Sequence, residues 1–260
     1  MLRLLRIEWG KLWPYRAFRV LFVLYFVLLI GSLLIGRNLR DDEGGIDTML
    51  KIFDLPNIWN YYLYYACVFN VIPGILTIFI LTNEYSYKTI RQNLIDGLSR
   101  RELYISKLAL IIILTGLSTV TVYISGAIAG MLYNPGSSMG ELFERNVLIL
   151  GYAVQSLGVL SMAAFFAVLL KRSGLATILF LLFIFPLDVI LNQALLRGCC
   201  SDYLPVSVYF VKIINSPWRM FRSFGADPQT ALELVPVLVG ISYILVFQVA
   251  TWLLIKRRDL

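Results

Sequence analysis

The residues best suited to chemistry lie in one polar segment, residues 83–107, between two long apolar runs. Glu84, Lys88 and Arg91 are spaced four and three residues apart, so on one continuous helix they would share a face. Charged side chains in this pattern suit a surface that docks a partner, or a solvated loop whose basic residues only enforce membrane topology. The sequence contains no histidine, which excludes an HExxH zinc site and a Ser-His catalytic pair.

The middle of this segment contains the signals for a turn between two helices. Asp96-Gly97 is expected to end the first helix, because glycine adopts the left-handed conformation at little cost. Ser99 and Glu102 have the spacing of a capping box, in which the serine caps a new helix and the glutamate reaches back to it. We therefore expect two helices joined by a tight turn, with an alternating-charge surface.

This pattern resembles that of the type-2 ABC transporter permease family. In such permeases a Glu at the end of the second span is followed by Thr, Arg, a turn, Ser-Arg and a later Lys. The positions that match in this chain are Glu84, Thr89, Arg91, Gly97-Leu98, Ser99-Arg100 and Lys107. The family often has a proline near the turn, where this chain has Gly97-Leu98.

The resemblance implies that the segment is a coupling hairpin, which docks in a groove of a separate ATP-binding subunit. The residues expected to contact or support that partner are Glu84, Lys88, Thr89, Arg91, Gly97, Ser99, Arg100, Arg101 and Glu102. The resemblance also implies a homodimer or heterodimer of permeases, and export as the direction. No G-x-x-x-x-G-K-[ST] loop occurs, so ATP and Mg²⁺ are expected on the partner and no cofactor on this chain.

The composition indicates an integral membrane protein. The chain has 260 residues, of which 59% are hydrophobic and 15% are charged. Soluble domains have about 25% charged residues, so this mixture leaves too little polar surface to face water. The net charge of +7 suits topology control and anionic membrane lipids better than nucleic acid. Because backbone polar groups must be paired inside a bilayer, the predicted fold is all-α.

Six apolar stretches are long enough to span a bilayer. They cover residues 17–36, 61–82, 108–131, 147–170, 175–195 and 235–255. The fifth is interrupted by Pro186, Asp188, Asn192 and Gln193. Two further segments complete a single permease domain over residues 1–260: an amphipathic elbow helix at 1–14 and a short helical, external or re-entrant insertion at 197–234.

The distribution of basic residues predicts the orientation. Six spans leave both termini on one side, and fifteen Lys and Arg lie on that side against eight on the other. The chain is therefore expected in the cell (inner) membrane with cytoplasmic termini. The larger set is Arg3, Arg6, Lys11, Arg16, Arg19, Lys88, Arg91, Arg100, Arg101, Lys107, Lys171, Arg172, Lys256, Arg257 and Arg258. The smaller set is Arg37, Arg40, Lys51, Arg145, Arg197, Lys212, Arg219 and Arg222.

Polar residues inside the spans are the candidates for a translocation path. Each is equally suited to a hydrogen bond between helices, and Asp188 either forms a gate or bend or ends a helix in water. Gly126 and Gly130 have the spacing of a close helix contact. The path candidates are Asn70, Gln155, Ser156, Asp188, Asn192 and Gln193.

Three classes of function remain at this point. The first is the permease subunit of an ATP-driven transporter, and the second is a membrane anchoring or mechanotransmission protein that works with an ATPase without moving a substrate. The third is an intramembrane enzyme or ion-coupled carrier, for which Asp188 is the one clear intramembrane carboxylate. The three cysteines do not have a metal-binding spacing, and the pairing of Cys199 and Cys200 stays open. The apolar spans favour a lipid-like, peptide or hydrophobic cargo.

Overall fold

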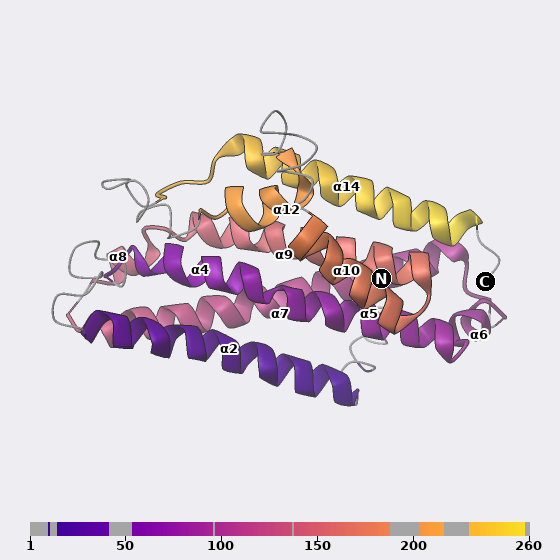
Figure 1. Cartoon of the computed structure of the whole chain (residues 1–260), viewed down its shortest axis with the longest axis horizontal. Coiled ribbons are helices and arrows are strands. Elements are labelled where there is room, and N and C mark those ends of the chain that lie inside the picture. The colour runs from indigo at the N-terminus through magenta and orange to yellow at the C-terminus, as the bar shows by residue number, and fades with distance from the viewer. Residues whose placement is uncertain are drawn as a thin grey trace.

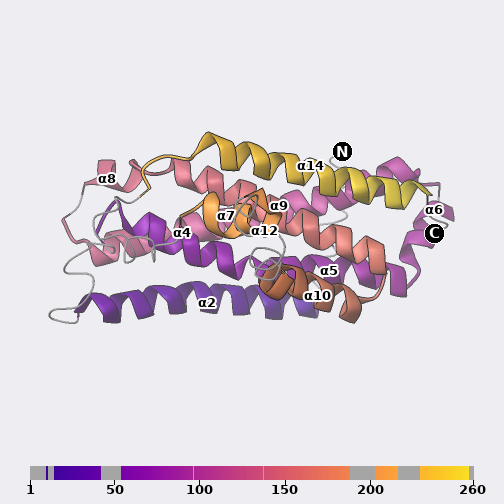
Figure 2. The same ribbon diagram turned by 45° about the horizontal axis from the view of Figure 1, so that its top comes forward.

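A computed structural model describes residues 10, 15–41, 54–95, 97–136, 138–187, 203–215 and 229–257 of the chain. Its regular elements are helices, and the long ones lie side by side as a bundle (Figures 1 and 2). They are α2 (Arg16–Asp41), α4 (Ile58–Phe69), α5 (Val71–Ser86), α6 (Thr89–Ile95), α7 (Arg100–Tyr133), α8 (Met139–Phe143), α9 (Val147–Leu170), α10 (Ser173–Leu182), α12 (Pro205–Ser207) and α14 (Leu234–Arg257). Two π-helical turns cover Phe183–Leu187 and Val208–Lys212.

Five helical segments are long and apolar enough to cross a membrane. They are Arg16–Ile35, Ile58–Ser86, Arg100–Tyr133, Gly140–Leu170 and Leu234–Arg257. These segments confirm the prediction of an all-helical membrane protein and match the first four predicted spans and the last. At the predicted fifth span the structure describes a shorter apolar helix, Ser173–Phe185. Residues 188–195 lie outside the described residues, so a complete fifth span, and with it the total of six, stays a prediction.

The second span is two helices rather than one. α4 ends and α5 begins at Asn70, whose amide nitrogen donates to the carbonyls of Ala66 and Cys67 at 3.1 and 3.3 Å. Pro73 explains the interruption, because proline has no N–H to donate to the carbonyl four residues earlier. The break gives Asn70 a fully buried side chain in the middle of the bundle.

α9 is the central helix of the bundle. It packs against α5, α7, α10 and α14, and Figures 1 and 2 show it running alongside α14 through the middle of the bundle. Its sequence is apolar or small on every side, with Gly151, Ser156, Gly158 and Ala163 all buried. α2 and α14 instead keep wide exposed apolar faces, as expected of helices that contact lipid.

The predicted insertion at 197–234 is described at 203–215 and 229–233, and the predicted elbow helix at 1–14 lies outside the described residues except for Gly10. The insertion contains α12 and the turn Val208–Lys212. Tyr209 is fully buried there, and its hydroxyl donates to the carbonyl of Gly240 on α14 at 2.8 Å. A Cβ on Gly158 of α9 would collide with the Tyr209 ring. Tyr209 therefore fastens this segment to α9 and α14.

The two glycines of the predicted close contact both lie at tight packing positions on α7. A Cβ on Gly126 would lie 2.7 Å from the ring of Trp59 and 2.8 Å from that of Tyr62, both on α4. A Cβ on Gly130 would lie 3.2 Å from Leu55 and 3.3 Å from Leu142. At Gly126 the ring of a buried tryptophan thus occupies the space that any other residue would need.

We predict that Gly126→Ala destabilises the folded chain by about 1–3 kcal/mol, because overpacking forces the Trp59 ring to move. Gly116→Ala on the same helix is the matched control, since a Cβ there meets nothing within 4 Å. The control should be neutral or should stabilise the folded chain by about 0.5–1 kcal/mol, because alanine lowers the backbone entropy of the unfolded chain relative to glycine. Thermal unfolding of both purified variants in the same detergent measures the difference. Equal melting temperatures would contradict the packing argument.

Candidate functional site

The polar hairpin starts with a break that the sequence spacing did not predict. α5 ends at Ser86, and Lys88 adopts a left-handed conformation with φ of 55° before α6 begins at Thr89. The Thr89 hydroxyl donates to the carbonyl of Glu84 at 3.2 Å and so helps to close the end of α5. The prediction that Glu84, Lys88 and Arg91 share one helical face is therefore wrong. Glu84 is buried, whereas Lys88 is exposed beyond the break.

The predicted glycine turn is confirmed. Gly97 has φ of +95°, in the left-handed region that favours glycine. Its amide donates to the carbonyl of Leu94 at 3.2 Å, and the amide of Leu98 donates to the carbonyl of Asn93 at 3.0 Å. These two bonds form a Schellman motif, which satisfies the last carbonyls of α6. The turn therefore has a defined geometry without the proline often found in the family.

The predicted capping box at the start of α7 is also confirmed. The Glu102 amide donates to the Ser99 hydroxyl oxygen at 3.2 Å, and Glu102 Oε2 accepts from the Ser99 amide at 2.8 Å and its hydroxyl at 2.7 Å. Ser99 itself is extended, with φ of −72° and ψ of 154°. This reciprocal pairing satisfies the first amides of α7, so its start is well defined even though both side chains are exposed.

A buried ion pair joins the two arms at the base of the hairpin. Lys107 Nζ on α7 pairs with Glu84 Oε2 on α5, and the two side chains are only 5% and 10% exposed. Two charges in such a position are stable only together, because removal of one leaves an uncompensated buried charge. The predicted polar segment 83–107 is thus partly interior: its ends belong to the bundle, and only the part between them projects.

The same end of the bundle contains a small apolar cluster separate from the main core. It consists of Ile90 on α6, Leu103 on α7, Val168 on α9 and Ile255 on α14. The guanidinium of Arg100 donates to the backbone carbonyl of Lys256, at the end of α14. The hairpin is therefore fastened to the ends of α9 and α14 as well as to its own two arms.

The start of α2 joins this end of the bundle as well. Asn83 Nδ2 donates to the Tyr15 hydroxyl at 2.5 Å. Partial burial raises the pKa of the Tyr15 phenol above its ordinary value, so the hydroxyl stays protonated at neutral pH. The first span thus begins in contact with the end of the second.

The projecting part of the hairpin exposes large apolar side chains beside charged ones. Tyr87 is 77% exposed and Ile95 is 70% exposed. Lys88, Arg101 and Glu102 are exposed near them in the sequence. Exposed apolar residues are ordinary where lipid covers a span, but on a polar hairpin they form a patch of the kind found where proteins bind partners or membranes.

A second polar cluster lies fully buried in the middle of the bundle. Asn70 Nδ2 donates to Gln155 Oε1 at 2.6 Å, and the Tyr152 hydroxyl donates to Asn70 Oδ1 at 2.9 Å. Ser156 lies 3.5 Å from Asn70 Oδ1 and 3.2 Å from the Ser118 hydroxyl. The structure therefore brings together the predicted path residues Asn70, Gln155 and Ser156, as partners of one another and not as the lining of an open channel.

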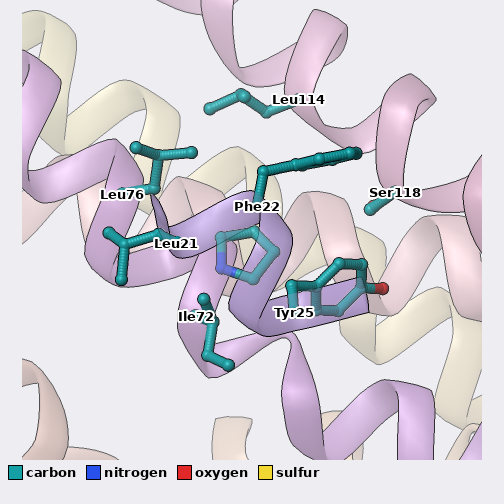
Figure 3. A pocket seen from close by; sticks show the side chains of 8 residues that line it. Leu21, Phe22, Tyr25, Ile72, Leu76, Leu114 and Ser118 are labelled. Carbon is teal, nitrogen blue, oxygen red and sulfur yellow. The ribbon is translucent and has the colours of Figure 1, made fainter. Parts of the chain in front are cut away.

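Tyr25 extends this cluster to α2, since its hydroxyl lies 2.6 Å from that of Tyr152. A hollow lies beside it where α2, α5 and α7 meet (Figure 3). The hydroxyls of Tyr25 and Ser118 are the polar side-chain groups among the residues that line it, so the hollow suits an apolar group better than an ion. Its lining is Leu21, Phe22, Tyr25, Ile72, Pro73, Leu76, Leu114 and Ser118.

Several predicted site residues cannot be placed in this arrangement. Asp188, Asn192 and Gln193 lie outside the described residues, and of Arg91 only the backbone in α6 is described. Among the residues that the structure describes, no group of three or more His, Cys, Asp or Glu could hold a metal ion. Sequence reasoning missed the Glu84–Lys107 pair, although the two residues lie at similar distances in sequence from Gly97 and so face each other across an antiparallel hairpin.

The described residues form a helical membrane bundle with a polar hairpin between its second and third spans. A family model described as ABC-2 family transporter protein matches residues 4–187, more than half of the chain. The chain therefore belongs to the ABC-2 transporter family, and this membership makes it a membrane component of an ABC transporter and implies an ABC ATP-binding partner. No curated protein matches the chain in sequence.

We predict that Lys107→Met destabilises the chain by about 3–5 kcal/mol, because the buried Glu84 carboxylate loses the cation with which it forms an ion pair. The double variant Glu84→Gln with Lys107→Met should recover most of this loss, since neither charge then remains. Arg172→Met, which removes an exposed charge at the same end, serves as the control. Melting temperatures in detergent report all three, and additive losses in the double variant would contradict a direct pair.

Proposed function

We propose that the chain is the permease subunit of an ATP-driven exporter, and that the hairpin between Asn83 and Lys107 docks onto a separate ATP-binding subunit that carries ATP and Mg²⁺. The observation that carries this proposal is the combination of a rigid base and an exposed apolar tip in one hairpin. Glu84 and Lys107 are buried as an ion pair at its base, whereas Ile95, near the Gly97 turn, and Tyr87, just after the end of α5, are exposed. Family membership supports the same partner.

The hairpin has the construction of a lever. The helix α7 runs without interruption from the tip of the hairpin through the third span, so a push at Arg100 is transmitted along 34 residues. The Schellman turn at Gly97 and the capping box at Ser99 limit bending at the tip. The ion pair prevents the two arms from sliding past each other. Movement of the partner would therefore tilt the second and third spans together.

The tip has the chemistry of a docking surface. Aromatic and large aliphatic side chains contribute most to protein interfaces when they fill a pocket in the partner. Tyr87 and Ile95 have that character, and Arg101 and Lys88 beside them would steer the tip toward an acidic groove. We propose that these side chains, together with Glu102 and Thr89, contact the ATP-binding subunit.

The remaining architecture of the proposed transporter follows from topology and family membership. We propose that the chain lies in the cell (inner) membrane. The hairpin end of the bundle is proposed to face the cytoplasm, because fifteen of the basic residues fall on that side. A sixth crossing near residues 175–195 would return the chain for the last span α14. Two such subunits, identical or similar, would enclose the path, and export is proposed because the resembling permeases are mostly exporters.

The path itself is proposed to open beside the buried polar cluster. Asn70, Gln155 and Ser156 are hydrogen-bonded to one another in this structure, so cargo could pass them only after α4, α5 and α9 separate. The aromatic and aliphatic spans favour a hydrophobic or lipid-like cargo over an ion. The break at Asn70 provides a point at which the second span can bend.

We predict that Arg101→Glu reduces capture of the ATP-binding subunit by about tenfold, which corresponds to about 1.4 kcal/mol. The subunit is identified as the P-loop protein that co-purifies with the wild-type chain. Arg101 is exposed in the first turn of α7, where a glutamate favours the helix, so the variant keeps the fold. Arg172→Glu is the matched control, with the same charge change at an exposed site outside the hairpin. Equal capture by the Arg101→Glu variant and by the control would refute the docking site.

We also predict that Asp47 is external and Arg172 is cytoplasmic. The test uses Asp47→Cys and Arg172→Cys in chains whose own three cysteines are replaced by serine. A membrane-impermeant maleimide should label position 47 in intact cells, and position 172 only after permeabilisation. The reverse pattern would overturn the orientation.

A further inference from the structure

A hydrogen-bonded link connects the hairpin end of α7 to the last helix. The Tyr104 hydroxyl donates to Gln248 Oε1 on α14 at 3.1 Å, and Gln248 Nε2 donates to the Ser161 hydroxyl on α9 at 2.9 Å. Gln248 and Ser161 are buried, and Tyr104 is half-buried just inside the capped start of α7. One glutamine thus uses both ends of its amide to join three helices.

Two further contacts lie along the same line. The rings of Tyr104 and Trp252 have centroids 5.3 Å apart, one turn of α14 beyond Gln248. The Arg100 guanidinium donates to the Lys256 carbonyl, a further turn toward the end of α14. The positions 248, 252 and 256 are spaced four residues apart, so they form one row on α14. That row faces the first turns of α7.

Besides this row, α14 contacts the hairpin through Ile255, which packs in the apolar cluster with Ile90 and Leu103. Its contacts are mainly with α9 and much less with α7, and most of its surface is exposed. In a bilayer, apolar side chains on such a surface are satisfied by lipid and resist sliding only weakly. A buried amide that loses its partners in hydrocarbon is costly. The row of polar contacts from Tyr104 and Arg100 therefore fixes the position of α14 relative to α7.

We propose that Tyr104 and Gln248 are positioning residues that transmit movement of the hairpin to α14, and through Ser161 to α9. This inference rests on the proposed function, in which a partner subunit moves the hairpin. Movement of the hairpin is then transmitted along two routes. One route runs through its own arms to the second and third spans, and the other runs through this link to the last span. Tyr104 is not on the exposed tip, so the link can be broken without altering the docking surface.

The test measures ATP-driven movement in the complex of the full chain with its co-purified ATP-binding subunit in lipid nanodiscs. Spin labels at exposed positions report two distances after the native cysteines are replaced by serine: Ile178 to Ile112 follows α7, and Ile178 to Leu253 follows α14. In the complex whose Tyr104 and Gln248 are unchanged, both distances should change when Mg-ATP is added. Tyr104→Phe, which keeps the ring, and Gln248→Leu should each reduce the α14 change to less than half and leave the α7 change intact.

Tyr243→Phe is the matched control, because the Tyr243 hydroxyl also joins α14 to another segment, at the Tyr203 carbonyl 2.9 Å away, but not to the hairpin. In this control variant, the change in the α14 distance on addition of Mg-ATP should equal that of the wild type. The double variant of Tyr104 and Gln248 should lose no more than either single variant, since both remove one link. Full α14 movement in the variants overturns the inference, as does a changed α14 distance before ATP is added, which marks a merely structural role. Absence of α7 movement in the wild type instead refutes the proposed function.

Discussion

A charge buried at the edge of a bilayer must have its partner within reach, and the ion pair of Glu84 and Lys107 meets this constraint at the base of the hairpin. The pair fixes the register of α5 against α7, because a shift of either helix by one turn would separate the charges. The turn and the capping box at the tip are then held at a defined distance from the end of the bundle. Everything that projects from the bundle at this end depends on that register.

The same constraint acts on uncharged polar groups deeper in the bundle. Asn70 lies at the break that Pro73 causes, and its side-chain amide forms hydrogen bonds with Gln155 and Tyr152. Such a cluster stabilises one arrangement of helices while every member is paired, and it becomes costly when the helices separate. A bundle built this way has discrete states, which a transporter needs, rather than a continuous range of shapes.

Local features of the hairpin could be predicted from the sequence and non-local ones could not. The Gly97 turn and the Ser99 cap depend on residues within one helical turn, so their pattern is legible in the chain itself. The left-handed Lys88 carries no such signal, because lysine seldom adopts that conformation. Tyr104 and Gln248 are 144 residues apart, and only packing of the last helix brings them together.

Burial divides the hairpin into parts with different physical roles. Side chains at its base are paired with other side chains or backbone of the same chain, so their interactions are complete within one subunit. Tyr87, just after the end of α5, and Ile95, near the Gly97 turn, are exposed although they are apolar, and none of the five spans found in the described residues includes them. A partner that covers them gains apolar burial without disturbing the base, because the contacts that keep the hairpin rigid are not those that the partner needs. Under the proposed function, partner binding and force transmission would therefore depend on different residues of one short segment.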